Sequence, residues 1–185
     1  MGAPPARAGR GVVSSPNLLK QRTVLSYARR FGLRTLIETG TFFGDMIRAT
    51  KRYFARVISV ELDEALHERA VREFARDPHI TIFHGDNGCV LPELLRTVTE
   101  PCLFWLDSHY SGGITAKAEV ETPIRQERET IFSHARPDHV ILIDDARCFD
   151  GTHNYPMQDG LREFVTVQRP TWEFSVEDDI IRMHP

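Results

Sequence analysis

The sequence contains no long hydrophobic run, and this absence argues against a membrane-spanning helix. Its first residues also lack the apolar core of a signal peptide. Cysteine is scarce, and the 3 cysteines are widely spaced without a C-x-x-C motif, which is typical of reduced thiols. A formal net charge of −3 gives no general attraction to nucleic acid or anionic lipid. We therefore expect a cytoplasmic protein that binds neither nucleic acid nor membrane.

The composition that remains is that of an ordinary globular chain. With 185 residues, 41% hydrophobic and 26% charged, the sequence is most simply one domain with a full core. Residues 1–16 are rich in Gly, Ala, Pro and Ser and are predicted to be a flexible arm, which leaves 17–185 as the domain. Asn17 is a suitable cap for a first helix, and Gly32 ends it.

Beyond this helix, short apolar runs alternate with stretches of helical periodicity. The strand-like runs are Thr35–Glu38, Arg56–Glu61, His79–His84, Cys102–Asp107 and His139–Asp144, and the helical stretches are Asp45–Phe54, Asp63–Ala75, Gly88–Val98 and Pro123–Ala135. This alternation indicates a doubly wound, parallel α/β sheet. A helix over Pro156–Gln168 then precedes two strand-like pieces, Trp172–Glu177 and Ile180–His184, which predict an antiparallel hairpin at one edge. The expected sheet has seven strands.

The stretch from Leu36 to Gly44 is typical of a strand, a tight turn and a helix start, where backbone N–H groups hold a ligand. Thr39-Gly40-Thr41 would form the turn beneath that ligand, with Gly40 permitting close approach of the backbone. Glu61 ends the next strand about 20 residues further on, where an acid grips a ribose. These features predict a nucleoside-cofactor pocket.

Acidic residues follow nearly every predicted strand, and in such a sheet ligands bind beyond the carboxyl ends of the strands. These acids are Glu38, Glu61, Asp86, Asp107 and the pair Asp144-Asp145. We expect most of them to line one pocket. Leu62 is placed to lie against a purine, with core packing as the alternative. Asp86-Asn87 offers an acceptor and an amide to an adenine edge, and a helix cap explains the same pair equally well.

In their order along the chain, these motifs resemble those of class I S-adenosylmethionine-dependent methyltransferases. The resemblance rests on Glu38-Thr-Gly-Thr-Phe-Phe-Gly44, Val60-Glu61, Gly85-Asp86 and Leu106-Asp107, and it extends from Thr35 to the C-terminus. It implies that Glu38 to Gly44 surround the methionine part, that Glu61 binds the ribose and that Asp86 lies near the adenine. The third position of the usual glycine pattern is Thr41 here, not glycine. That departure also occurs in metal-dependent small-molecule O-methyltransferases.

The second half of the chain carries a candidate metal site and candidate bases. Asp107, Asp144 and Asp145 would repel one another unless a hard cation such as Mg²⁺ neutralised them. This resembles the catechol and macrolide-sugar O-methyltransferases, although the catechol type has Asp-Asn where this chain has Asp144-Asp145. Without a metal, Asp145 would cap the following turn. His109 is the candidate catalytic base for a hydroxyl acceptor, and Lys117 is the second choice.

The sequence therefore favours a methyltransferase that acts on the hydroxyl of a small polar compound, with a glycosyl unit among the candidates. A nicotinamide-dependent oxidoreductase is the alternative, disfavoured because Gly40 and Gly44 do not form G-x-G-x-x-G. A non-catalytic cofactor-binding or scaffold domain is a further alternative. Only one helix precedes the first predicted strand, so little structure is left to cover an acceptor. A partner subunit would supply that cover in a homodimer.

Overall fold

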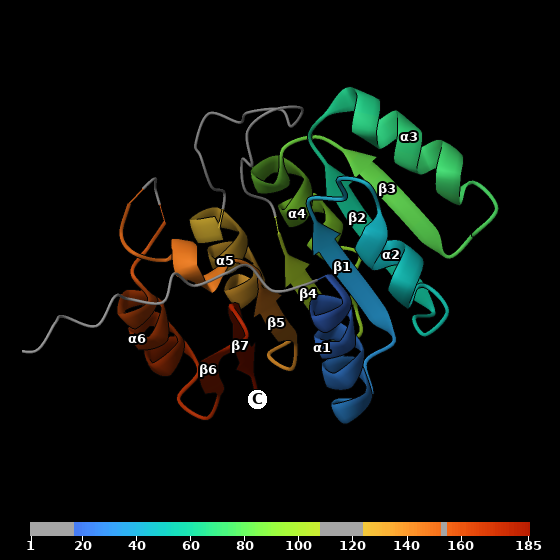
Figure 1. Ribbon diagram of the computed structural model, residues 1–185. Coiled ribbons are helices and arrows are strands. Elements are labelled where there is room, and N and C mark those ends of the chain that lie inside the picture. The colour runs from blue at the N-terminus through green and yellow to red at the C-terminus, as the bar shows by residue number, and fades with distance from the viewer. Residues whose placement is uncertain (1–16, 108–123, 153–154) are drawn as a thin grey trace, which may run out of the picture.

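The structure is a computed structural model that describes residues 17–107, 124–152 and 155–185. Within these residues, one sheet of seven strands has the order β3-β2-β1-β4-β5-β7-β6 (Figure 1). The strands are β1 (Thr35–Thr39), β2 (Arg56–Glu61), β3 (Ile80–His84), β4 (Cys102–Leu106), β5 (Val140–Ile143), β6 (Glu173–Glu177) and β7 (Ile180–His184). Strands β1 to β5 pair in parallel, and β7 pairs antiparallel with both β5 and β6. The predicted sheet and its C-terminal hairpin are confirmed.

In the described part of the chain, three helices pack on each face of the sheet (Figure 1). One face carries α1 (Asn17–Arg30), α2 (Asp45–Thr50) and α3 (Glu64–Phe74), and the other carries α4 (Asn87–Leu95), α5 (Ile124–Ser133) and α6 (Gln158–Gln168). Successive side chains of a strand point to opposite faces, so Leu36 and Leu103 join the core under α1 while Ile37 and Phe104 join the core under α4 and α5. The continuous apolar runs of the central strands follow from this double burial.

Two parts of the predicted pattern change in the structure. The helix expected over Asp45–Phe54 ends at Thr50, because Phe54 turns back into the core from the loop that follows. A short 3-10 helix, η1 (Ala146–Cys148), follows β5 and was not predicted. Among the described residues, no helix combines the length and the apolar character that a bilayer crossing requires. The expected flexible arm 1–16 lies outside the described residues.

The hairpin between β6 and β7 turns through two aspartates with left-handed backbone. Asp178 and Asp179 have φ values of 53° and 60°, as in the type I′ turn whose twist suits two-residue hairpins. Asp179 is buried, and its carboxylate accepts the backbone N–H of Arg147 (2.8 Å) and pairs with the Arg147 guanidinium. Its carbonyl accepts the N–H of Ala146 (2.9 Å). The hairpin tip therefore holds η1 in place directly after the end of β5.

A proline inside α4 fixes how α5 packs beside it. Pro92 has no N–H, so the carbonyl of Gly88 loses its partner within the helix. The side-chain amide of Gln126 on α5 donates to that carbonyl instead (3.2 Å). A Cβ on residue 88 would lie only 2.3 Å from Gln126 Oε1, so glycine makes room for this contact. The pairing places α5 against the start of α4, next to the end of β3.

Candidate functional site

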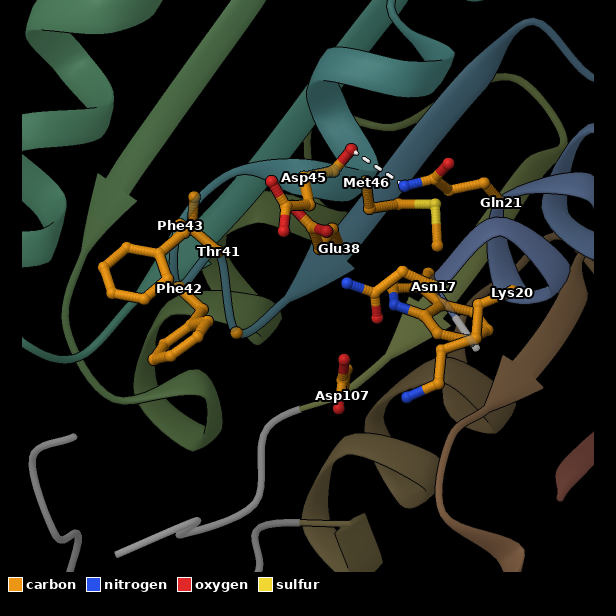
Figure 2. A pocket seen from close by; sticks show the side chains of 12 residues that line it. Asn17, Lys20, Gln21, Glu38, Thr41, Phe42, Phe43, Asp45, Met46 and Asp107 are labelled. Atoms are coloured by element: carbon orange, nitrogen blue, oxygen red, sulfur yellow. Dashed lines mark hydrogen bonds between the residues drawn. The ribbon is translucent and has the colours of Figure 1, made fainter. Parts of the chain in front are cut away.

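A cavity opens beyond the carboxyl ends of β1 and β4, beneath the first turn of α1 (Figure 2). The chain leaves β1 toward β2 on one side, while β4 lies on the other side, so this is the switch point of the sheet. The described residues that line the cavity are Asn17, Lys20, Gln21, Glu38, Gly40, Thr41, Phe42, Phe43, Asp45, Met46, Trp105 and Asp107. Two of the predicted strand-end acids, Glu38 and Asp107, thus face the same space.

The turn between β1 and α2 forms one wall of the cavity. Gly40 and Gly44 have positive φ values of 85° and 77°, and the N–H of Gly40 donates to the carbonyl of Val60 (3.0 Å). A Cβ on residue 44 would lie 2.9 Å from Cε2 of Phe74, so the turn packs closely on α3. Phe42 also has a positive φ, 49°, which an aromatic residue adopts only under constraint. Its N–H donates to Oε2 of Glu61 (2.7 Å).

Glu38 is a buried acid in the wall of the cavity. It is 2% exposed, and its Oε2 accepts a hydrogen bond from Ser59 Oγ (2.6 Å), which itself lies 2.6 Å from Thr41 Oγ1. Burial raises the pKa of Glu38 to about 8, and the negative charges of Asp107 and Glu61 act in the same direction against the Ser59 hydrogen bond. At neutral pH the site therefore holds a protonated carboxyl that a bound cation would ionise.

The other predicted cofactor residues surround this wall without lining the cavity. Glu61 is buried and holds the turn through Phe42, and its Oε1 accepts the N–H of Asp63 (3.0 Å). Asp86 caps α4 by accepting the N–H of Gly88 (2.8 Å), so the cap considered for this residue is present. Leu62, Asp86 and the buried Asn87 are not among the described lining residues.

Thr39, the last residue of β1, is fully buried beside this wall. Its hydroxyl has no hydrogen-bond partner among the described residues. A buried donor without a partner is uncommon in folded proteins. The cofactor roles of all these residues remain predictions.

The three aspartates of the predicted metal site do converge. One carboxylate oxygen from each of Asp107, Asp144 and Asp145 lies within 4.8 Å of the others. Asp145 has left-handed backbone, with φ 55° and ψ 47°, and its N–H donates to Asp144 Oδ1 (2.8 Å). Burial raises the pKa of Asp144 to about 7, and the charges of Asp107 and Asp145 add to this effect while Lys20 opposes it.

Lys20, a residue that the sequence analysis missed, reaches this cluster from α1. Its ammonium forms an ion pair with Asp144 Oδ2 and lies 4.0 Å from Asp145 Oδ1. The side chain is 13% exposed. Burial alone would lower the pKa of Lys20, but the hydrogen bond to Asp144 and the charges of the three aspartates raise it overall. A signal was present, because Asn17, Lys20 and Gln21 recur at the spacing of one helix face.

The donor set suits Mg²⁺, but two of its three aspartates already contact a cation. Carboxylate oxygens are the ligands that this ion prefers. Lys20 is bound to Asp144, and Arg147 Nη1 lies 2.7 Å from Asp145 Oδ1, so two cations contact the cluster of three acids. In this arrangement the residues do not fit a divalent ion, which would have to bind beside the Lys20 ammonium. The candidate bases His109 and Lys117 lie outside the described residues.

Solved structures of methyltransferases share this architecture. The O-methyltransferase TomG from Streptomyces achromogenes, in complex with S-adenosylmethionine, has a TM-score of 0.62 and 18% identity over 89% of this chain and 78% of its own. The O-methyltransferase from Bacillus cereus, in complex with S-adenosylhomocysteine, has a TM-score of 0.64 and 19% identity over 95% of this chain and 84% of its own. The chain has the fold of the class I methyltransferases.

The same fold also occurs in an enzyme that methylates nitrogen. The N-methyltransferase NodS from Bradyrhizobium japonicum WM9, in complex with S-adenosylhomocysteine, has a TM-score of 0.57 and 15% identity over 92% of this chain and 88% of its own. No protein-family model matches the sequence, and no curated protein is similar to it. The methyltransferase fold therefore does not identify the methyl acceptor, which depends on the residues of the site.

Proposed function

We propose that this chain is an S-adenosylmethionine-dependent methyltransferase that transfers the methyl group to a hydroxyl of a small polar compound. The observation that carries the proposal is the cavity at the switch point of a methyltransferase fold, lined by Glu38, Asp107 and the turn from Gly40 to Phe43. Similar folds have been solved with S-adenosylmethionine or S-adenosylhomocysteine bound. A glycosyl unit is one acceptor that these polar walls suit.

The cofactor supplies an activated methyl group on a positively charged sulfur, and the protein's task is chiefly alignment. The turn after β1 holds the methionine part, with Glu38 as the acid for its amino group. Glu61 at the end of β2 is the acid for the ribose, and Asp86 at the end of β3 lies toward the adenine. Both Glu38 and Glu61 are buried, so a hydrogen bond from the cofactor to either forms away from competing water.

In the transfer step, the acceptor oxygen bonds to the methyl carbon in line with the carbon–sulfur bond that breaks. The electron pair of that bond stays on sulfur, and the hydroxyl proton passes to a base. His109 is our candidate for this base and Lys117 the second. Because Lys20 and Arg147 pair with the acidic cluster, the proposed reaction contains no metal-bound step. We further propose that the protein acts in the cytoplasm as a homodimer whose partner subunit helps to cover the acceptor.

Calorimetry with S-adenosylhomocysteine tests this proposal. We expect the wild-type protein to bind it and Glu61→Ala to bind about tenfold to a hundredfold more weakly, as the loss of a charged hydrogen-bonding group predicts. Glu93→Ala is the matched control, because Glu93 is an exposed acid on α4 that pairs with Arg96 on the surface. Binding of NAD(H) without binding of S-adenosylhomocysteine would favour the oxidoreductase alternative. Binding without methyl transfer to any of a broad panel of hydroxyl acceptors would favour a non-catalytic domain.

A further inference from the structure

Lys20 is held at the acidic cluster by the packing of its helix. Val24 and Ala28 lie on the buried face of α1 and share a core with Trp105 of β4. The polar face of α1 closes the cavity, and Figure 2 shows Lys20 directed toward the same space as Asp107. The helix is thus anchored by its apolar side, which places Lys20 beside the cluster.

Two cations form ion pairs with aspartates of the cluster. Asp144 contacts Lys20, and Asp145 contacts Arg147, which is also bound to the buried Asp179. Lys20 lies on the cavity side of this network, whereas Arg147 is held on the side of η1 and the hairpin. Of the two cations, only Lys20 lines the cavity within the described part of the chain.

We propose that the Lys20 ammonium is the resident cation of this site and takes the place that a divalent ion occupies in metal-dependent enzymes of the same fold. An ammonium has three N–H donors, and Asp144 takes one of them. A second donor is directed to the acceptor oxygen at the floor of the cavity, an assignment that rests on the proposed function. A point charge of this kind holds one oxygen, whereas a metal chelates two, so the acceptor needs no adjacent pair of hydroxyls.

Binding of Mn²⁺, followed by electron paramagnetic resonance, tests the resident cation without any activity assay. We expect Mn²⁺ to stay free beside the wild-type protein and to bind Lys20→Met at least roughly tenfold more tightly. Lys51→Met is the matched control, because Lys51 also pairs with an aspartate, Asp77 (2.6 Å), but far from the cavity. It should behave as wild type. Lys20→Arg keeps the charge and should also leave Mn²⁺ free, and Lys20→Met combined with Asp144→Asn should lose the gained site.

Stoichiometric Mn²⁺ binding by the wild-type protein, abolished by Asp144→Asn, would overturn the proposal. That measurement needs no lysine variant, so it decides the question even where Lys20→Met fails to fold. Failure of Lys20→Met to gain Mn²⁺ while it still folds would also contradict the proposal.

Once a methyl acceptor is known, steady-state kinetics tests the proposed contact between Lys20 and the acceptor oxygen. Lys20→Met should raise the KM for the acceptor by a larger factor than it weakens S-adenosylhomocysteine binding, and chelators should not reduce wild-type activity. A wild-type protein that fails to bind S-adenosylhomocysteine contradicts the proposed function. One that binds it and also binds Mn²⁺ at the aspartates contradicts only the assignment of Lys20.

Discussion

Acid should destabilise this protein through one buried histidine at the amino ends of the strands, opposite to the ends that border the cavity. His139 is 1% exposed, and its Nδ1 accepts the backbone N–H of Cys102 (3.1 Å). Neutral His139 therefore carries its proton on Nε2 and donates it to Nδ1 of His134 (2.9 Å). His134 in turn donates from Nε2 to the carbonyl of Leu95 (3.1 Å). Protonating His139 would convert Nδ1 from an acceptor into an N–H donor that faces the backbone N–H of Cys102.

The pKa shift sets the size and the sign of the effect. Burial lowers the pKa of His139 from 6.5 to about 4, and the nearby His134 and Arg136 act in the same direction against Asp138. As the pH falls below about 6.5, His139 therefore binds a proton in the unfolded chain but stays neutral in the folded protein. The contribution to stability is complete above pH 6.5 and is lost as the pH falls toward 4. At about 1.4 kcal/mol per pKa unit, the loss is about 2 kcal/mol by pH 5 and about 3 kcal/mol by pH 4.

Urea unfolding at about pH 7.5 and about pH 5 measures this loss. His139→Asn keeps an acceptor for Cys102 but does not titrate, so its free energy of unfolding should fall by ~2 kcal/mol less than that of wild type over this range. His84→Asn is the matched control, since His84 is an exposed histidine on β3, and it should retain the wild-type loss. Equal losses in wild type and His139→Asn would refute the reasoning.

Two further predictions concern the turn after β1. Because the pKa of Glu38 is about 8, binding the cationic amino group of S-adenosylhomocysteine near neutral pH should release close to one proton from Glu38, seen by calorimetry in buffers of different ionisation enthalpy. Glu38→Gln should release none, and an unchanged proton count there would contradict the assignment. Gly44→Ala should cost ~1–3 kcal/mol of unfolding free energy because its Cβ meets Phe74 at a positive φ. Gly160→Ala, in open space on α6, should instead stabilise by ~0.5–1 kcal/mol, and similar effects at both sites would argue against the close packing.

Local patterns predicted the fold well because each element of this sheet carries its own signal. β4 and β5 are apolar throughout, as strands covered on both faces must be, and their expected bounds differ from the observed ones by at most one residue at each end. The hairpin followed from the turn at Asp178 and Asp179. The helix after β1 was overextended, because Phe54 continues the apolar periodicity although it packs into the core from a loop. Periodicity records burial and does not distinguish the two cases.

In the site, the topology of the sheet determines which acids meet, and the packing of α1 and the hairpin determines which cations contact them. In a parallel sheet the strand ends meet at one edge, so the convergence of Asp107, Asp144 and Asp145 could be inferred from their positions alone. The helix-face spacing was a signal for Lys20, but the ion pairs of Lys20 and Arg147 could not be inferred, because they depend on how α1 and the hairpin tip dock against that edge. Counting acids alone predicts a divalent ion, whereas in the folded protein two of these three aspartates already contact a cation. The identity of the cation therefore depends on a helix that no strand-end motif includes.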